Sequence, residues 1–402
     1  MLPLMLKELT ADTIAGRARA AGEPAWLIER RETAWSFFAQ AAPPVWRRTD
    51  LSGLDADALS VVPGSVALSV VWDEAMAAQG VVVKPLRQAL ASHGELIRQY
   101  LDAAVPPLEH KFSALRAALW QDGAFVYVPR GVAAEAPIHV RYTLPEGSRT
   151  TFPRTLVIVE ATAQVTVIED FVGPDQLAPA LAAPVSEIFA GPGSKVRFIS
   201  VQRWGGGVYH IGGQRLLLDR DADAEWTSIA LGGQVQHIEA ETTLKGDGSR
   251  VNWLGATFAS GTQTLLSAPW LRHVGHSAES FMQFKTVVND TGYSVFDGMI
   301  KIERESSSTS TRLEEHALHL SPKARNDSIP GLKIDTNSVI KGGHASTSGD
   351  VEEEQLFYMQ SRGISKADAK RMIVMGFFNP ALDTIPLEEL RRELEALIEG
   401  KI

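Results

Sequence analysis

The chain has 402 residues, of which 45% are hydrophobic and 22% are charged, and its formal net charge is −9. This length can bury at least one large core and indicates two or three structural regions. The negative charge, without any Lys/Arg cluster, argues against nucleic acid or an anionic membrane as a partner, because both need a basic surface. No apolar run approaches the ~20 residues of a membrane span, and the opening MLPLMLKELTADT lacks an export signal, so we expect a cytoplasmic protein.

Residues 1–118 are predicted to be mainly helical. The segments ETAWSFFAQ (32–40) and LRQALASHGELIRQYLDAA (86–104) have helical periodicity and are separated by proline-rich or glycine-containing breaks. Between them, SVALSVVWDEAMAAQGVVV (65–83) is expected to contribute a strand or two.

Residues 119–345 are predicted to form a β core that contains a repeat. Five small apolar anchors recur at intervals of 31, 28, 27 and 27 residues: Val165, Val196, Ala224, Val251 and Ala278. Polar residues flank four of the anchors on both sides, which is the in-out alternation of a half-buried strand. Such periods favour stacked β coils, with a sandwich of antiparallel hairpins as the alternative.

Two further features support the coils. Aromatic residues follow three of the anchors at the same distance, and glycine pairs that permit tight corners precede two of them. These residues are Phe198, Trp226 and Trp253, and the pairs Gly191/Gly193 and Gly246/Gly248.

Residues 346–402 are predicted to form a helical region. The acidic opening at Glu352 suits a short helix that reaches Gln360, and Gly363 ends it. Ser365, three residues before Asp368, starts a second helix that we expect to break at Asn379-Pro380. A third helix follows Pro386, and one face is predicted to comprise Leu387, Leu390, Leu394, Leu397 and Ile398.

The absence of cysteine restricts the metal chemistry of this chain. Thiolate is the usual protein ligand of iron–sulfur clusters, and this chain supplies none. It also forms no disulfide. Iron or a nascent cluster would need histidine or carboxylate ligands, or a partner that supplies the sulfur.

Several motifs resemble the SufB/SufD family, and the SufD branch most closely. At the C-terminus these are HAST, EEEQLFYMQSRGIS, KRMIVMGFF and IPLEELRRELE; upstream they are AWLIERRETAW, WRRTDLSGL, GAFVYVPRGVAAEAPIHV, SVFDGMIKI and LSPKARNDSIPGLKI. The family belongs to a bacterial iron–sulfur cluster assembly machine. The resemblance implies a right-handed parallel β-helix (β-solenoid) core flanked by N-terminal and C-terminal helical regions.

His344 has the most distinctive surroundings of the ten histidines. Gly342 and Gly343 allow close backbone approach, and the small Ala345 leaves the imidazole uncrowded. Matched to the SufD signature, His344 takes the position of the histidine linked to cluster assembly at the interface with SufB.

A second candidate site lies in RLEEHALHLSPKA. Glu314, Glu315 and His316 form a candidate iron site, with solvated charge as the alternative. His316 and His319 have a spacing that chelates a metal from a helix, but in a strand the two side chains point to opposite faces. By resemblance, His316 falls roughly where SufB-like relatives carry their cysteine.

The resemblance also implies that the C-terminal helices are the docking surface for the SufC ATPase. Their apolar residues lie on more than one helix face, so self-packing is not expected to cover all of them. Methionine also adapts well to a partner surface. The expected contacts are Arg362, Met372, Met375, Phe377 and Phe378.

The resulting interpretation is a SufD-like, non-catalytic scaffold subunit of the SUF complex. One end of its β-helix is expected to pair edge to edge with SufB, since main-chain hydrogen bonds extend a sheet across two chains. We expect no stably bound cofactor, and a transient iron or iron–sulfur cluster shared with SufB. A homodimer of the isolated chain is left open, as are two alternative functions: a SufB-like homodimeric scaffold and a carbohydrate-active β-helix enzyme.

Overall fold

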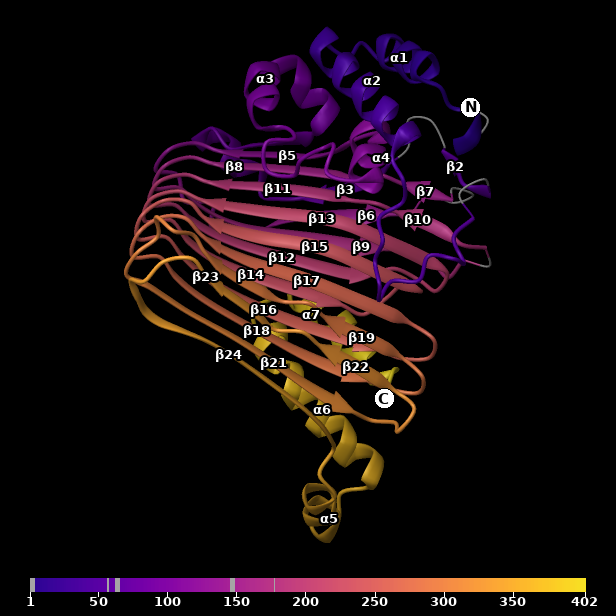
Figure 1. Cartoon of the computed structure of the whole chain (residues 1–402), viewed down its shortest axis with the longest axis vertical. Coiled ribbons are helices and arrows are strands. Elements are labelled where there is room, and N and C mark those ends of the chain that lie inside the picture. The colour runs from indigo at the N-terminus through magenta and orange to yellow at the C-terminus, as the bar shows by residue number, and fades with distance from the viewer. Residues whose placement is uncertain (1–3, 56–57, 62–65, 145–148, 177) are drawn as a thin grey trace.

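The computed structural model describes residues 4–55, 58–61, 66–144, 149–176 and 178–402. The chain is mainly β, with 41% strand and 25% helix, and forms a β-solenoid of about 8 turns with helices at both termini (Figure 1). The predicted β-helix core with flanking helical regions is confirmed. Among the described residues, no helix is both long and apolar enough to cross a membrane.

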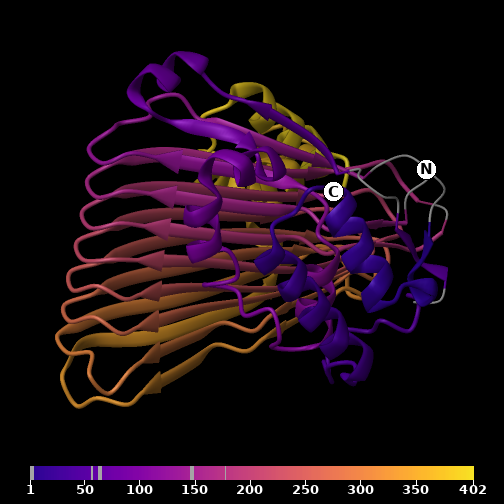
Figure 2. The same cartoon turned by 90° about the horizontal axis from the view of Figure 1, so that it is seen from above.

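Two long sheets form the walls of the solenoid, and each turn contributes a strand to both (Figure 2). In chain order, the first sheet contains β3 (Ala67–Val71), β6 (Ile138–Thr143), β9 (Gln164–Val172), β12 (Lys195–Arg203), β14 (Asp223–Ala230), β16 (Arg250–Ala259), β18 (Glu279–Val288), β21 (Thr309–His319) and β24 (Val339–Asp350). The main path of the second contains β4 (Val82–Pro85), β5 (Gly123–Val128), β8 (Arg154–Val159), β11 (Val185–Ala190), β13 (Val208–Leu218), β15 (Val235–Leu244), β17 (Thr264–His273), β19 (Tyr293–Phe296) and β22 (Arg325–Ser328).

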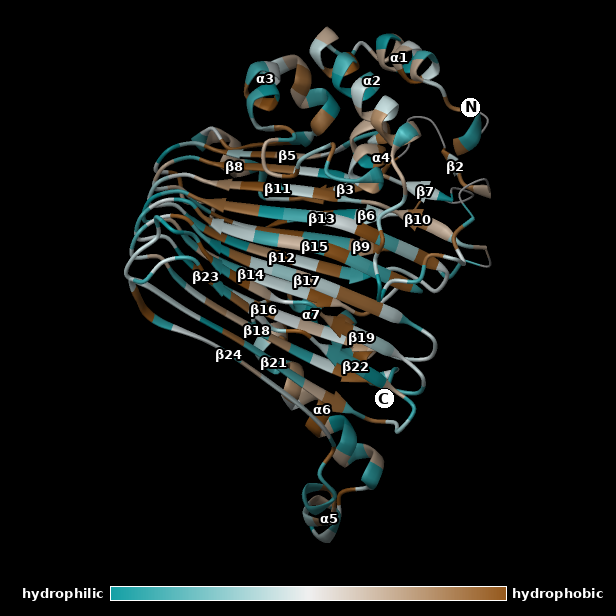
Figure 3. Ribbon diagram, in the orientation of Figure 1, coloured by the Kyte–Doolittle hydropathy of each residue, from teal (hydrophilic) through white to brown (hydrophobic). Residues whose placement is uncertain are grey.

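Shorter elements complete the strands. The second sheet also includes β7 (Thr150–Thr151), β10 (Ala180–Ala182), β20 (Met299–Ile302) and β23 (Gly331–Ile334), and a separate pair joins β1 (Leu4–Met5) to β2 (Ser60–Val61). Neighbouring strands of the two walls are parallel except where β3 meets β6 and β4 meets β5. Hydrophobic and hydrophilic residues alternate along many of the strands, as expected for strands with one face buried (Figure 3).

The strand register confirms four of the five repeat anchors. Val165, Val196, Ala224 and Val251 are paired in successive strands. The fifth was wrong, because Val251 pairs with Ser280 and not with Ala278. Ala278 is a buried residue of the preceding corner, two positions away, so it presents a similar small residue on the same face of the chain.

The repeated aromatic position builds a column of side chains inside the solenoid. Trp226 and Trp253 stack with ring centroids 4.0 Å apart and planes at 6°. Following the register through every coil gives Ile138, Val167, Phe198, Trp226, Trp253, Met282, Leu313 and His344. An otherwise apolar interior column therefore ends in an imidazole at the last strand.

The glycine pairs form tight corners, as predicted. Gly193 and Gly248 have φ of 65° and 69°, the left-handed region that favours glycine. A Cβ on Gly246 would lie 1.9 Å from the backbone nitrogen of Arg220 in the preceding coil. The corners therefore need glycine both for conformation and for the close stacking of successive turns.

The N-terminal helices cover one end of the solenoid (Figures 1 and 2). They are α1 (Ala11–Ala20), α2 (Ala25–Gln40), α3 (Leu86–Tyr100) and α4 (Lys111–Leu119), with short 3₁₀ helices η1 (Leu6–Glu8) and η3 (Glu74–Gln79). Leu27 and Leu115 share a buried cluster with Leu156 and Ile158 of β8. Both predicted helical segments are confirmed, and the segment expected to contribute a strand or two contains β3 and β4.

The C-terminal helices are α5 (Glu353–Ser361), α6 (Lys366–Leu382) and α7 (Glu388–Glu399). Of these, α6 and α7 pack on the outer face of the first sheet, whereas α5 contacts α6. Ser365 caps α6 as predicted, because its hydroxyl accepts a hydrogen bond from the amide of Asp368 at 3.1 Å. The predicted break at Pro380 was wrong: α6 continues for two more residues, and burial of Ala381 and Leu382 against the sheet offsets the lost backbone hydrogen bond.

The face predicted for the last helix is nearly correct. Leu390, Leu394 and Ile398 are buried against the outer face of the sheet. Leu397 is exposed instead, because it lies one residue away from Ile398 and so about 100° around the helix.

Candidate functional site at the open end of the solenoid

The last strand, β24, forms an open edge. Within the described part of the chain its partner is β21, and its other edge is unpaired. Every residue of β24 is exposed or half-buried, and Ile340 is 74% exposed. An unpaired strand of 12 residues presents a row of backbone donors and acceptors that another chain can extend.

His344 lies in the middle of this edge strand. It pairs in register with the buried Leu313, so it continues the interior column, yet it is itself exposed. A Cβ on the preceding Gly343, which faces the opposite side of the strand, would meet no heavy atom within 4 Å. The imidazole is exposed at the open edge of the solenoid.

Glu315 points into the end of the solenoid close to His344. Its carboxylate lies 3.0 Å from the hydroxyl of Ser346 and accepts a hydrogen bond from the amide nitrogen of Asn326 at 3.2 Å. Ser346 lies in turn 2.7 Å from the hydroxyl of Ser328. Burial raises the pKa of Glu315, and the hydrogen bonds from these neighbours partly oppose that shift.

The three residues of the candidate iron site do not share one face. Glu314 and His316 lie on the outside of β21, with 3.6 Å between the His316 Nε2 and a Glu314 oxygen, whereas Glu315 is buried inside. His316 and His319 contact different hydroxyls of β24, those of Thr347 and Ser348. The geometry therefore separates the inward carboxylate from the outward pair.

The predicted SufC-docking residues divide by exposure. Met372 is 52% exposed and Arg362 is exposed, while Met375 and Phe377 are half-buried. Phe378 is fully buried and packs against Phe258 of β16. As a core residue it cannot contact a partner, so the available surface excludes it.

The exposed part of this region extends onto α5. Phe357 and Tyr358 are 73% and 60% exposed, and α5 projects beyond the sheets (Figure 1). These two aromatic side chains were not among the predicted contacts, although they lie in the quoted motif. Burial on one helix face could not be assigned from sequence because α5 has hydrophobic residues around much of its circumference.

A cluster of acidic and histidine side chains on the second sheet was not predicted. Among the described residues, Glu109, His110 and Glu239 bring candidate ligand atoms within 4.8 Å of one another. Burial would raise the pKa of Glu239, but the hydrogen bond from His110 and the charge of Arg116 lower it to about 2. The signal was absent from the sequence because His110 and Glu239 are separated by 129 residues.

This cluster is a structural contact. The Nδ1 of His110 accepts hydrogen bonds from two backbone amides at the start of α4, at 3.1 and 3.3 Å. Its Nε2 therefore carries the proton and donates it to Glu239 at 2.9 Å. A proton on that nitrogen blocks metal binding, and the bond attaches α4 to β15.

The fold and this open end define a class of protein: a thiol-free β-solenoid whose last strand presents a histidine on an edge that is unpaired among the described residues. Residues 142–377 match the family described as "SUF system FeS cluster assembly, SufBD core domain", and residues 38–140 match the "SufBD protein N-terminal region". The first match covers more than half of the chain. The chain belongs to the SufB/SufD family, as predicted.

Relatives named SufB and SufD are similar to this chain to almost the same degree. It is 31% identical to the iron–sulfur cluster assembly protein SufD of Bacillus subtilis strain 168, over 81% of this chain and 74% of the relative. It is 29% identical to SufB of the same strain, over 93% and 82%. A SufBD family protein of Staphylococcus epidermidis is 27% identical over 98% and 94%. This family match supersedes the alternative of a carbohydrate-active enzyme.

Proposed function

We propose that this chain is a SufD-type scaffold subunit, not a catalyst, which pairs with a SufB-type subunit during iron–sulfur cluster assembly in the cytoplasm. The observation that carries the proposal is the combination of an exposed His344 at the open end with a complete absence of cysteine. A chain with one imidazole and no thiolate at this position can contribute to a cluster site but needs sulfur ligands from elsewhere.

Edge-to-edge pairing supplies the missing half of the site. A strand of the SufB-type subunit hydrogen-bonds to β24 and extends the first sheet across both chains. His344 then faces residues of the partner that bring sulfur, and the cluster is cargo held between the two subunits. Glu315 and Ser346 lie beside it and provide polar atoms at the same opening.

The C-terminal helices give the scaffold a second contact. We assign to the SufC ATPase the exposed surface of α5 and α6, defined by Phe357, Tyr358, Arg362 and Met372. Exposed aromatic and methionine side chains are typical of protein interfaces. The chain itself has no P-loop sequence, so ATP hydrolysis belongs to the partner.

The test replaces His344 by alanine and measures iron–sulfur enzyme maturation in cells that depend on this chain. We expect maturation to fall roughly tenfold or more, as for the loss of a group that supports a metal site, while the complex with the partner subunits still co-purifies. His276→Ala is the matched control, since His276 is also exposed but lies at a solenoid corner. Normal maturation with His344→Ala would contradict the proposed role.

The alternative is a SufB-like homodimeric scaffold. The 29% identity to a SufB protein supports it. Reconstitution of the purified chain with iron and sulfide distinguishes the two. A SufD-type subunit alone is expected to show no visible cluster absorption, whereas a self-sufficient scaffold would show it and transfer the cluster to an acceptor protein.

A further inference from the structure

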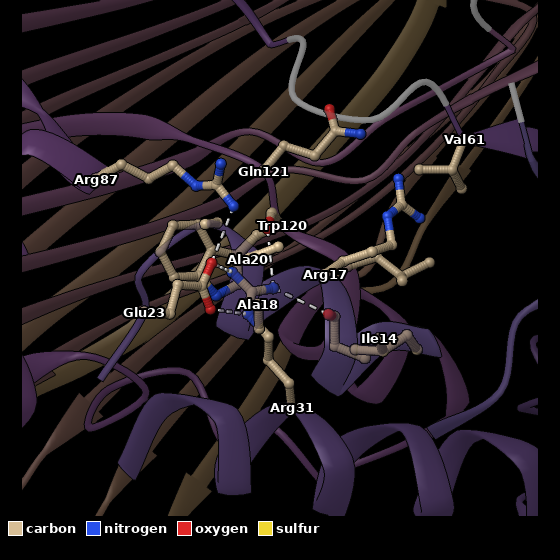
Figure 4. Close-up of a pocket in the computed structure, with 13 residues that line it drawn as sticks. Ile14, Arg17, Ala18, Ala20, Glu23, Arg31, Val61, Arg87, Trp120 and Gln121 are labelled. Atoms are coloured by element: carbon tan, nitrogen blue, oxygen red, sulfur yellow. Dashed lines mark hydrogen bonds and ion pairs between the residues drawn. The ribbon is translucent and has the colours of Figure 1, made fainter. Parts of the chain in front are cut away.

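A pocket of about 290 Å³ lies within the N-terminal helical region, at the end of the solenoid opposite β24 (Figures 1 and 4). Its walls come from the four N-terminal helices, the two residues that follow α4, and β2. Apolar side chains make up most of the lining, among them Ile14, Ala18, Val61, Leu119 and Trp120. A concave and mainly apolar surface with a few polar groups is typical of small-molecule sites.

One ion pair at the pocket is complete. Arg31 donates to the two carboxylate oxygens of Glu23 at 2.7 and 2.9 Å. Its remaining terminal nitrogen donates to the carbonyl oxygens of Ala118 and Trp120, both at 2.9 Å. Arg31 and Glu23 are both buried, and each neutralises the other.

The other two arginines at the pocket, Arg17 and Arg87, have no carboxylate of their own among the residues that line it. Arg87 shares Glu23 through one hydrogen bond of 2.9 Å, but its Nε is buried without a hydrogen-bond partner. Arg17 has neither an ion pair nor a hydrogen bond from its side chain to any described residue. Burial lowers the pKa of Arg17, and repulsion from Arg87 lowers it further.

The charges at the pocket therefore do not balance. Three arginines face one carboxylate, which leaves an excess of two positive charges beside an apolar wall. The nearby carboxylate of Asp122 accepts from the backbone amides of Arg87 and Gly123 at 3.1 and 2.8 Å, and among the described residues it forms no ion pair with the side chain of Arg17 or Arg87. Partly buried like charges are unfavourable unless an anion joins them.

We propose that this pocket binds an amphipathic organic anion. A carboxylate or phosphate head lies between Arg17 and Arg87, and a compact apolar body covers Ile14, Val61 and Trp120. Guanidinium groups match both oxyanions because their parallel N–H donors can form two hydrogen bonds at once. The volume is at the small end of known ligand sites, which selects a short chain or a single ring.

The experiment uses the purified full-length chain and isothermal titration calorimetry with octanoate, octyl phosphate and octanamide. Both anions share their apolar body with the neutral amide. We expect at least one anion to bind ten or more times tighter than octanamide, and the stronger anion identifies the preferred head. Added salt should weaken this binding, since the charges are only partly buried.

Three variants at two positions of the same helix make the test specific. Arg17→Gln should lose tenfold or more in affinity for the anion, and Arg17→Lys, which keeps the charge without the planar fork, should fall between it and the native chain. Arg19→Gln is the matched control, because Arg19 is exposed and pairs only distantly with Glu32, at 3.6 Å.

Three results would overturn the proposal. They are equal binding of octanamide and the anions, absence of binding by both anions, and equal affinities in Arg17→Gln and Arg19→Gln. Melting temperatures of the unliganded variants show whether each is folded, and Arg17→Lys provides a second measurement should the glutamine variant unfold.

Discussion

Glu169 is the most unusual single residue of the solenoid interior. Its carboxylate is fully buried and receives hydrogen bonds from Thr155 at 2.5 Å, from Ser186 at 2.8 Å and from Gln214 at 3.0 Å. Burial raises the pKa of Glu169 to about 7, although these hydrogen bonds oppose the shift. No positive charge takes part among these contacts, so the ionised form is costly.

The raised pKa predicts a specific pH dependence of stability. The folded chain keeps the Glu169 proton up to about pH 7, whereas the unfolded chain releases it near its ordinary value of 4.5. The contribution of Glu169 to the free energy of unfolding is therefore complete below pH 4.5. It is lost as the pH rises to 7 and above, so the free energy of unfolding falls by about 3 kcal/mol over this range. Urea unfolding of the native chain and Glu169→Gln between pH 4.5 and 8 measures the difference.

Glu169→Gln should remove this loss, because its amide does not ionise. Buried histidines such as His210 titrate in both proteins and cancel in the comparison. Glu135→Gln, an exposed substitution, should keep the native pH profile. Parallel profiles for the native chain and Glu169→Gln would show that Glu169 does not have a raised pKa.

At the scale of elements, α7 is attached to the solenoid through a buried carboxylate. Asp170 of β9 accepts hydrogen bonds from Arg141 at 2.8 Å and from Arg203 at 2.8 and 2.9 Å. Arg203 also pairs with Glu393 of α7 at 2.7 Å. Burial would raise the pKa of Asp170, but the hydrogen bonds and charges of Arg203 hold it well below its usual range.

Loss of this carboxylate should weaken the attachment strongly. Asp170→Asn leaves Arg203 with Glu393 as its remaining anionic partner, and loss of the buried hydrogen-bond partner costs about 1–3 kcal/mol. We expect a lower free energy of unfolding and faster hydrogen exchange in α7. Glu388→Gln is the control, since Glu388 pairs with Arg392 at the exposed surface of the same helix. Equal effects of the two substitutions would contradict the role of Asp170.

Local patterns predicted the elements more reliably than their contacts. The alternation around Val196, Ala224 and Val251 favoured stacked coils, because each strand of a solenoid repeats the same burial, but it left a sandwich of hairpins open until the family resemblance was added. The fifth anchor was placed at Ala278 instead of Ser280 because both residues are small and buried and lie two positions apart on the same face of the chain. Helix exposure was harder to infer: Phe378 is buried only because a sheet built from distant residues lies beside it.

At the scale of the molecule, the two ends of the first sheet differ. The β3 end is short and adjoins the N-terminal region, while the β24 end is long and open. The sequence indicated His344 through its glycine neighbours and its motif. Its place as the last member of an interior column, and the inward orientation of Glu315 toward Ser346 and Asn326, depend on register and could not be predicted from the sequence.

This asymmetry predicts which edge binds a partner. Ile340→Asp should weaken association with a SufB-type subunit tenfold or more, because an apolar side chain that becomes buried contributes about 1.5–3 kcal/mol. Val71→Asp on β3 is the matched control, since Val71 is 64% exposed on the other edge strand of the same sheet. Co-purification of each variant with the partner measures the effect, and equal losses would contradict use of the β24 edge.

The stacking of coils has a consequence for how such a chain can change in length. Helix α6 contacts β14, β16 and β18, and β24 lies three strands beyond β16. At the usual spacing of ~4.8 Å per strand, His344 stands about 14 Å along the axis from that platform. An insertion or deletion of one whole turn would move the imidazole by one strand spacing, and its side chain would stay on the inward face of the sheet. The separation between the C-terminal helices and the imidazole can therefore change only in whole steps, set by the number of turns between them.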